Sequence, residues 1–286
     1  MSVTHAPSPR AAAPAAPDRR RIFHGRGRSH GKITRLMSPG DLGTVLKPFV
    51  FLDLFDNQGD RFPTFGLHPH SGLATLTYVA EGSVSYEDTN GATGILREGG
   101  VEWMRAGKGV WHAGGAGDPG RTRGFQLWIA LPPLLELGGS ESLYQGASEI
   151  PQVGPVRVLL GEYAGVANAI APPSDMTYLA VSLQAGETWR YDPPAGHEVL
   201  WLAMGKGAVT APDLLEHGDI VIFDRTAGGV SFTAKSDAEF VIGSAAPHPH
   251  DLALGYYSVH TSPEALAAGE AHIAQIRERL VAQGRL

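Results

Sequence analysis

Short apolar or alternating segments, separated by glycine-containing turns, make up most of the chain. In the first half these segments are residues 48–54, 73–80, 83–88, 101–105 and 123–131. They are rich in β-branched and aromatic residues and are bounded by Gly, Asp or Pro, which is typical of β-strands. Because no helical repeat lies between them, the pattern predicts a small β-barrel or sandwich.

The second half repeats this organisation. Gly218-Asp219 before Ile220 matches Gly99-Gly100 before Val101, and the turn at 203–209 matches the one at 80–84. The expected strands of this half are residues 156–160, 177–183, 198–203, 208–210, 220–223, 230–232 and 240–243. We therefore expect an all-β protein with two related barrels in tandem.

Two segments favour helix. Residues 263–283 are rich in Ala and Glu, with Ser262 placed to cap the helix and Pro263 at its first position. Leu266, Ile273, Ile276 and Leu280 form an apolar stripe along it. A short helix is also expected at 134–137, between the two barrels.

Composition narrows the possible functions. The chain has 286 residues and no cysteine, so thiolate metal sites, disulfides and cysteine nucleophiles are excluded. Its net charge of −6 argues against strong direct binding to nucleic acid. There is no apolar run of about eighteen residues, so we expect no membrane span.

The first residues differ from the rest. Residues 1–21 are rich in Ala, Pro and Arg and lack the apolar stretch of a secretory signal, so we expect a disordered tail and a cytoplasmic protein. The predicted organisation is then a tail at 1–21, an N-terminal barrel at 22–140 and a C-terminal barrel with the terminal helix at 141–286. We expect a monomer.

Three histidines of the first half form a candidate metal site. His68 and His70 are two residues apart in a strand-like segment, so their side chains point to the same face. A third imidazole from a neighbouring strand would complete the site, and His112 is the candidate. Neutral imidazole suits Fe, Zn, Cu or Ni better than Mg or Ca.

Other motifs carry less information. His248 and His250 repeat the spacing, with His197 and His217 in the same half, but no complete ligand set is evident, so we expect no metal in the second barrel. Gly25-Arg26-Gly27-Arg28 follows no clear strand and precedes no helix, so it does not indicate dinucleotide binding.

These features together resemble the signature of the pirin family. The matching residues are His68-Pro69-His70-Ser71-Gly72, Thr75 to Val79, Glu81-Gly82, Trp103-Met104, Ala106 to Gly109, His112 and Gly124 to Trp128. The resemblance implies a bicupin, which is a protein of two tandem cupin β-barrels, with iron in the N-terminal one. It places metal ligation on His68, His70 and His112.

The chain departs from the family pattern at two positions. In the family, the third histidine is followed two residues later by a ligand glutamate, and Gly114 stands at that position here. Position 74, which is often glutamate in cupins, is Ala74. We therefore expect one divalent transition metal, weakly bound. Fe is the first candidate, with Zn, Ni, Cu or Mn as the others.

The resemblance implies two classes of function. The first is a quercetin 2,3-dioxygenase-type enzyme that opens the ring of a flavonol or a similar small aromatic molecule with dioxygen and releases carbon monoxide. The alternative is a non-enzymatic regulatory protein, responsive to its metal or redox state, that binds a transcription factor or a metabolic enzyme. The sequence names no protein partner.

Overall fold

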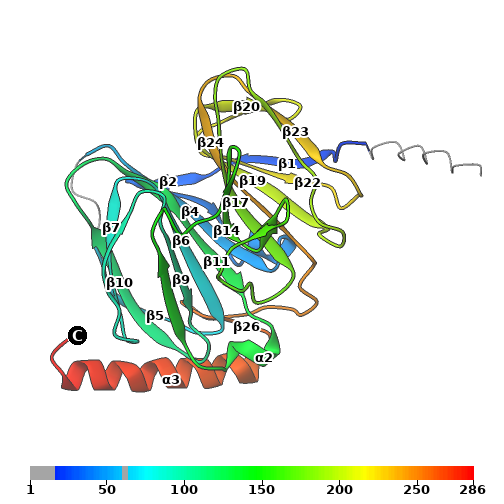
Figure 1. Ribbon diagram of the computed structural model, residues 1–286. Coiled ribbons are helices and arrows are strands. Elements are labelled where there is room, and N and C mark those ends of the chain that lie inside the picture. The colour runs from blue at the N-terminus through cyan, green and yellow to red at the C-terminus, as the bar shows by residue number, and fades with distance from the viewer. Residues whose placement is uncertain (1–16, 60–63) are drawn as a thin grey trace, which may run out of the picture.

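The computed structural model describes residues 17–59 and 64–286, and Figure 1 shows two β-structured units side by side with a long helix along one end. Each unit consists of a seven-stranded sheet and a four-stranded sheet. The expectation of an all-β bicupin with a C-terminal helix is thereby confirmed. Among the described residues, no helix is long and apolar enough to cross a membrane.

The N-terminal barrel is formed by two antiparallel sheets. Its large sheet has the order β12 (Glu141–Gln145), β9 (Val101–Arg105), β6 (Leu73–Glu81), β11 (Thr122–Ala130), β4 (Phe49–Asn57), β3 (Ile33–Met37) and β2 (Arg28–His30). Its small sheet has the order β5 (Phe65–His70), β10 (Val110–Ala116), β7 (Ser83–Asp88) and β8 (Thr93–Arg97).

The C-terminal barrel has the same layout. Its large sheet has the order β1 (Arg21–Arg26), β22 (Asp219–Phe223), β19 (Val199–Lys206), β24 (Ala238–Ala245), β17 (Met176–Leu183), β14 (Val156–Leu160) and β13 (Gln152–Val153). Its small sheet has the order β18 (Thr188–Tyr191), β23 (Val230–Ala234), β20 (Ala208–Thr210) and β21 (Leu214–Glu216). Two short ribbons complete the strands, β15 (Glu162–Tyr163) with β16 (Val166–Ala167) and β25 (Ala253–Leu254) with β26 (Val259–His260).

The two large sheets share one hydrophobic core. Apolar side chains of β6, β9 and β11 and those of β17, β19 and β24 belong to a single buried cluster, in which the Phe49 and Trp201 rings meet edge to face at 5.3 Å. Alternate residues of the same strands point the other way, into the barrel interiors. The alternation in the sequence therefore separates a core between the barrels from the space inside each barrel.

Each barrel includes a strand from a segment that was predicted to belong to the other part of the chain. β1 pairs with β22 of the C-terminal barrel, and Arg19, which precedes it, is buried and donates to the carbonyl of His197. β12 pairs with β9 of the N-terminal barrel. The two pairings differ from the predicted division of the chain into one barrel at 22–140 and a second at 141–286. Most of the expected tail, residues 1–16, lies outside the described residues.

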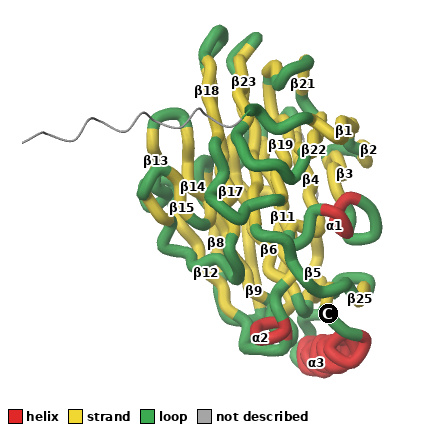
Figure 2. The backbone as a smooth tube through the Cα atoms, turned by 90° about the vertical axis from the view of Figure 1, so that its right-hand side faces the viewer, coloured by secondary structure: helices red, strands yellow, loops and turns green. Residues whose placement is uncertain are grey.

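Three helices connect or cover the strands. α1 (Leu42–Val45) and α2 (Pro133–Glu136) are single turns. α3 (Pro263–Ala282) begins after Ser262, whose side chain accepts a hydrogen bond from the backbone N–H of Ala265, as its sequence predicts. It packs against the N-terminal barrel, where the Trp111 indole of β10 donates to the Ile273 carbonyl at 2.9 Å. In Figure 2 this helix lies at the end of the molecule opposite to β18, β21 and β23.

Candidate metal centre

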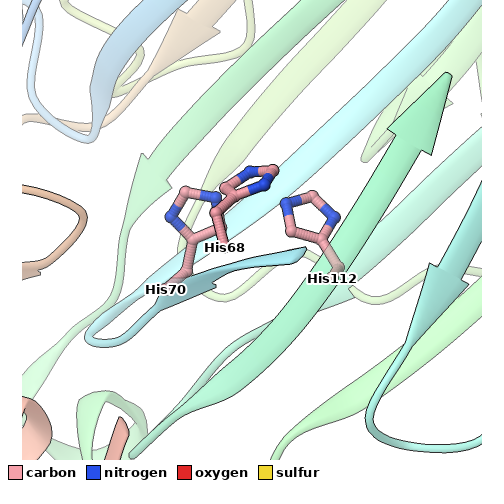
Figure 3. A group of neighbouring side chains, drawn as sticks. All are labelled: His68, His70 and His112. Atoms are coloured by element: carbon pink, nitrogen blue, oxygen red, sulfur yellow. The ribbon is translucent and has the colours of Figure 1, made fainter. Parts of the chain in front are cut away.

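Three imidazoles meet inside the N-terminal barrel, on the two neighbouring strands β5 and β10. His68 and His70 point to one face of β5, and His112 of β10 is paired directly with His68. Their ring centroids are 4.3 to 5.1 Å apart, and one nitrogen of each ring lies within 4.8 Å of those of the others. Figure 3 shows the ring of His112 pointing towards the other two. The spacing fits three donors around one ion.

Hydrogen bonds fix the orientation of two of these rings. Nδ1 of His68 lies 2.9 Å from the Gly66 carbonyl oxygen, and Nδ1 of His70 lies 3.0 Å from that of Tyr257. A carbonyl only accepts, so both Nδ1 atoms carry the proton and both Nε2 lone pairs are free for a metal. Nε2 of His112 is buried and has no hydrogen-bond partner among the described residues. Three unused nitrogens therefore face one space.

The C-terminal segment of the chain supports His70. At Gly72 the backbone has φ +74°, and a Cβ there would lie 2.1 Å from the Val259 carbonyl oxygen, so only glycine fits. This close approach lets Ser258 form a bridge with Ser71 and brings the Tyr257 carbonyl to the imidazole of His70. The glycine of the His-Pro-His-Ser-Gly motif thus has a defined structural role.

Burial keeps His68 and His70 neutral. Desolvation, followed by the charge of neighbouring His112, lowers the pKa of His68 to about 4. Burial, again with His112 as the next cause, lowers the pKa of His70 well below its usual value. Neutral imidazole is the form that binds metals, so protons compete little with a metal at neutral pH.

A cavity of about 210 Å³ adjoins the histidines. Its apolar walls include the Phe51 and Trp128 rings, stacked 4.1 Å apart, and Tyr86. Across it, inward-facing polar side chains of the large sheet form a row from strand to strand. In order, this polar row is Glu102 of β9, Thr77 of β6, Gln126 of β11, Asp53 of β4 and Arg35 of β3.

Hydrogen bonds link the polar row at both ends. Thr77 Oγ1 lies 2.8 Å from both Glu102 Oε2 and Gln126 Oε1, and Arg35 Nη2 donates to Asp53 Oδ2 at 3.1 Å. Burial raises the pKa of Asp53, although the Arg35 guanidinium opposes that shift. The guanidinium also lies 4.0 Å from the centre of the Phe51 ring.

The two departures from the family pattern have different structural meanings. Gly114 lines the cavity on the same strand as His112, and a Cβ there would meet only the Ser85 carbonyl oxygen, at 3.5 Å. Ala74, by contrast, is fully buried in the core between the barrels. The interpretation of Ala74 as a vacant position of the site is therefore wrong, because alternation along β6 directs it away from the histidines.

The other histidines lie elsewhere. His248 and His250 have ring centroids 5.5 Å apart, near the end of the C-terminal barrel. His197 is buried between Asp175 and Ser244, and Nδ1 of His217 contacts the Gly205 carbonyl. In residues 17–59 and 64–286 these four do not join a group of three ligands. The absence of metal from the second barrel stays a prediction.

Several residues of the site were not identified from the sequence. The side chains of Thr77, Gln126 and Asp53 and the Tyr257 carbonyl belong to segments that were interpreted only as strands or as the approach to the terminal helix. Strand alternation offers a signal for Glu102, a charged residue between the apolar Val101 and Trp103. No local pattern identifies Tyr257, because its carbonyl contacts His70, which lies 187 residues away in the sequence.

Known proteins are similar to this chain in sequence and in fold. The family model described as Pirin matches residues 31–129. A pirin-like protein of Caulobacter vibrioides is 34% identical over 191 residues, which cover 62% of this chain and 68% of that protein. A protein of Pseudomonas aeruginosa named "putative quercetin 2,3-dioxygenase" is 34% identical over 192 residues, which cover 63% of this chain and 67% of that protein.

A solved structure covers more of the chain. The crystal structure of quercetin 2,3-dioxygenase from Acinetobacter baumannii superposes with a TM-score of 0.82 and covers 92% of this chain and 98% of its own. The sequence identity is 24%, so this likeness concerns the fold.

Proposed function

The chain belongs to the pirin family, and we propose that His68, His70 and His112 hold one divalent transition metal in its N-terminal barrel. The observation that carries the proposal is the convergence of three unused imidazole nitrogens at a buried cavity. We propose Fe as the metal, with Zn, Ni, Cu or Mn as the alternatives that imidazole ligands allow. Because Gly114 supplies no carboxylate, binding is expected to be weak.

We further propose that the site acts as a dioxygenase of the quercetin 2,3-dioxygenase type on a flavonol or a similar small aromatic molecule. The cavity supports an aromatic substrate, since Phe51, Trp128 and Tyr86 line it and rings stack on such walls. Its volume of about 210 Å³ lies below the roughly 300–1,000 Å³ of common small-molecule sites. This favours a compact substrate, or a larger one that extends out of the opening.

The residues of the cavity have complementary roles in this proposal. When bound, the metal supplies Lewis-acid chemistry and a site for dioxygen. Thr77 and Gln126 present polar groups to substrate hydroxyls, while the aromatic walls exclude water and align the ring. Gly114 does not supply the ligand carboxylate that would accept the substrate proton. A positioned general base contributes about 10²- to 10⁴-fold, so turnover is expected to be slow.

The test is to load the purified protein with each of the five metals and to add quercetin or a smaller catechol. With quercetin, each turnover would consume one dioxygen and release one carbon monoxide, whereas ring opening of a catechol would consume dioxygen and release no carbon monoxide, so both gases are measured. His70→Ala is the matched control, because it removes a metal ligand inside the same cavity. Metal binding without dioxygen uptake on any substrate would contradict the enzymatic half of the proposal and favour the regulatory alternative.

A further inference from the structure

Glu102 is a buried carboxylate beside the candidate metal centre. It lies on β9, its side chain is 8% exposed, and its Oε1 lies 3.8 Å from Nδ1 of His112. Its second oxygen contacts the Thr77 hydroxyl at 2.8 Å. Neither partner carries a fixed positive charge, although a buried carboxylate normally requires one.

The Thr77 hydroxyl holds Glu102 in place. A hydroxyl has one proton, so Thr77 can donate to only one of its two partners, and the carboxylate is the stronger acceptor. The amide of Gln126, turned by half a rotation, then donates to Thr77 Oγ1. With Oε2 held in this way, Oε1 is left directed at the ring of His112.

The three candidate ligands can be compared by what each Nδ1 atom contacts. His68 and His70 each donate to a backbone carbonyl at hydrogen-bond distance. For His112 the facing acceptor is Glu102, and a movement of under about 1 Å would bring the pair into hydrogen-bond range. A metal-bound histidine usually donates its other N–H to an acceptor of this kind, which fixes the ring and raises its basicity.

We propose that Glu102 is the positioning residue of His112 and supplies, from the large sheet of the same barrel, the negative charge that Gly114 does not. This inference rests on the proposed metal binding by the three histidines. Three neutral imidazoles leave a divalent ion with its full double charge. A buried carboxylate next to one of those rings halves the net charge of the enclosed site, and the ion in turn compensates the carboxylate.

The experiment compares Glu102→Gln with wild type in metal titrations and in thermal unfolding without metal. The amide keeps the size of the side chain and removes its charge. We expect metal affinity to fall by about 10- to 100-fold. The metal-free protein should unfold at an equal or higher temperature, because an uncompensated buried charge is gone. A purely structural Glu102 would give the reverse, with lower metal-free stability and unchanged affinity.

Glu81→Gln is the matched control, because Glu81 is also a carboxylate of the large sheet, at the end of β6, but pairs with Arg121 and Arg123 and does not line the cavity. Its affinity should stay within about threefold of wild type, since partly exposed ion pairs contribute little. Gly114→Glu, introduced into Glu102→Gln, should restore most of the lost affinity. The absorption spectrum of bound Co(II) reports whether the ligand geometry changes in each variant.

Wild-type affinity in Glu102→Gln would overturn the inference. If that variant does not fold, Thr77→Val provides the test, because it keeps the charge and removes the hydrogen bond that directs it; unchanged affinity there would also overturn the inference. A wild-type protein that binds no metal would instead contradict the proposed function, so the two failures are distinguishable.

Discussion

The two barrels share a strand layout but fill their interiors differently. The polar row of the N-terminal barrel crosses five paired strands, and the equivalent strands of the C-terminal barrel pair in the same order. In that order, the residues of the second barrel are Val221, Leu202, Ile242, Leu179 and Val158. All five belong to one buried hydrophobic cluster.

This difference accounts for the position of the candidate metal centre in the N-terminal barrel. In the C-terminal barrel the apolar row packs with Trp189, Phe223, Phe232 and Phe240 into a closed core. In the N-terminal barrel the polar row faces a cavity, with three histidines at its border. The face between the barrels is apolar on both sides. The interior of the C-terminal barrel is thus filled with apolar side chains, whereas the interior of the N-terminal barrel is partly polar and contains a cavity.

The largest expected effect is a difference in stability between substitutions in the two barrel interiors. Leu202→Ala in the C-terminal barrel should lower the free energy of unfolding by about 2–5 kcal/mol, because it leaves a cavity in a packed core. Thr77→Ala, at the equivalent position of the N-terminal barrel, should cost only about 1 kcal/mol through a lost hydrogen bond. Urea unfolding of both metal-free variants measures this contrast. Equal costs would mean that the first barrel is packed like the second.

The next prediction concerns metal affinity after a histidine is removed from each barrel. His70→Ala should weaken metal binding by more than about 100-fold. Losing a ligand should cost more affinity than losing a residue that is hydrogen-bonded to a ligand, which costs about 10- to 100-fold. His248→Ala removes a histidine from the same spacing in the second barrel and should leave affinity unchanged. Titration with Fe(II) or Co(II) compares the two. A comparable loss in both variants would contradict a site confined to the first barrel.

Restoring the missing carboxylate should sharpen the same contrast. Gly114 has room for a side chain, so Gly114→Glu should place an anionic oxygen beside the histidines and tighten metal binding by about 10- to 100-fold. Any flavonol-cleaving activity should rise if the carboxylate also accepts a proton. Metal titration and oxygen uptake are measured beside wild type. Unchanged affinity would indicate that another oxygen already completes the site.

The smallest expected effect is a dependence of metal-free stability on pH. His68 has its pKa lowered to about 4 in the folded state, whereas an unfolded histidine titrates near 6.5. Between these values the unfolded chain binds more protons, so stability should fall as pH decreases from about 6.5 to 4. A His68→Gln/His70→Gln double variant should show a weaker dependence in thermal unfolding. An identical slope would mean that other groups dominate.

The sequence is sufficient for the parts of the fold that depend on local periodicity. Residues 83–88, 101–105 and 156–160 are strands with the predicted bounds, and Ser262 caps the terminal helix. The grouping of His68, His70 and His112 follows from alternation together with the family resemblance. Each of these features depends on residues within a few positions or on a motif with fixed spacing.

Non-local pairing explains what the sequence did not reveal. The strand at 21–26 joins the sheet of the other barrel, nearly 200 residues away in sequence, and α3 covers the first barrel although it follows the second. Ala74 shows the opposite problem, because a family comparison suggested a place in the site that its strand face excludes. Partners of this kind are fixed by tertiary packing rather than by local pattern.

The most direct test of the account is the metal content and structure of the metal-loaded protein, with anomalous diffraction to locate the ion. We expect one ion per chain, bound by Nε2 of His68, His70 and His112 at about 2.0–2.2 Å, with the interior of the C-terminal barrel free of metal. Metal at His197, His217, His248 or His250, or any of the three histidines turned away from the ion, would contradict the central claim.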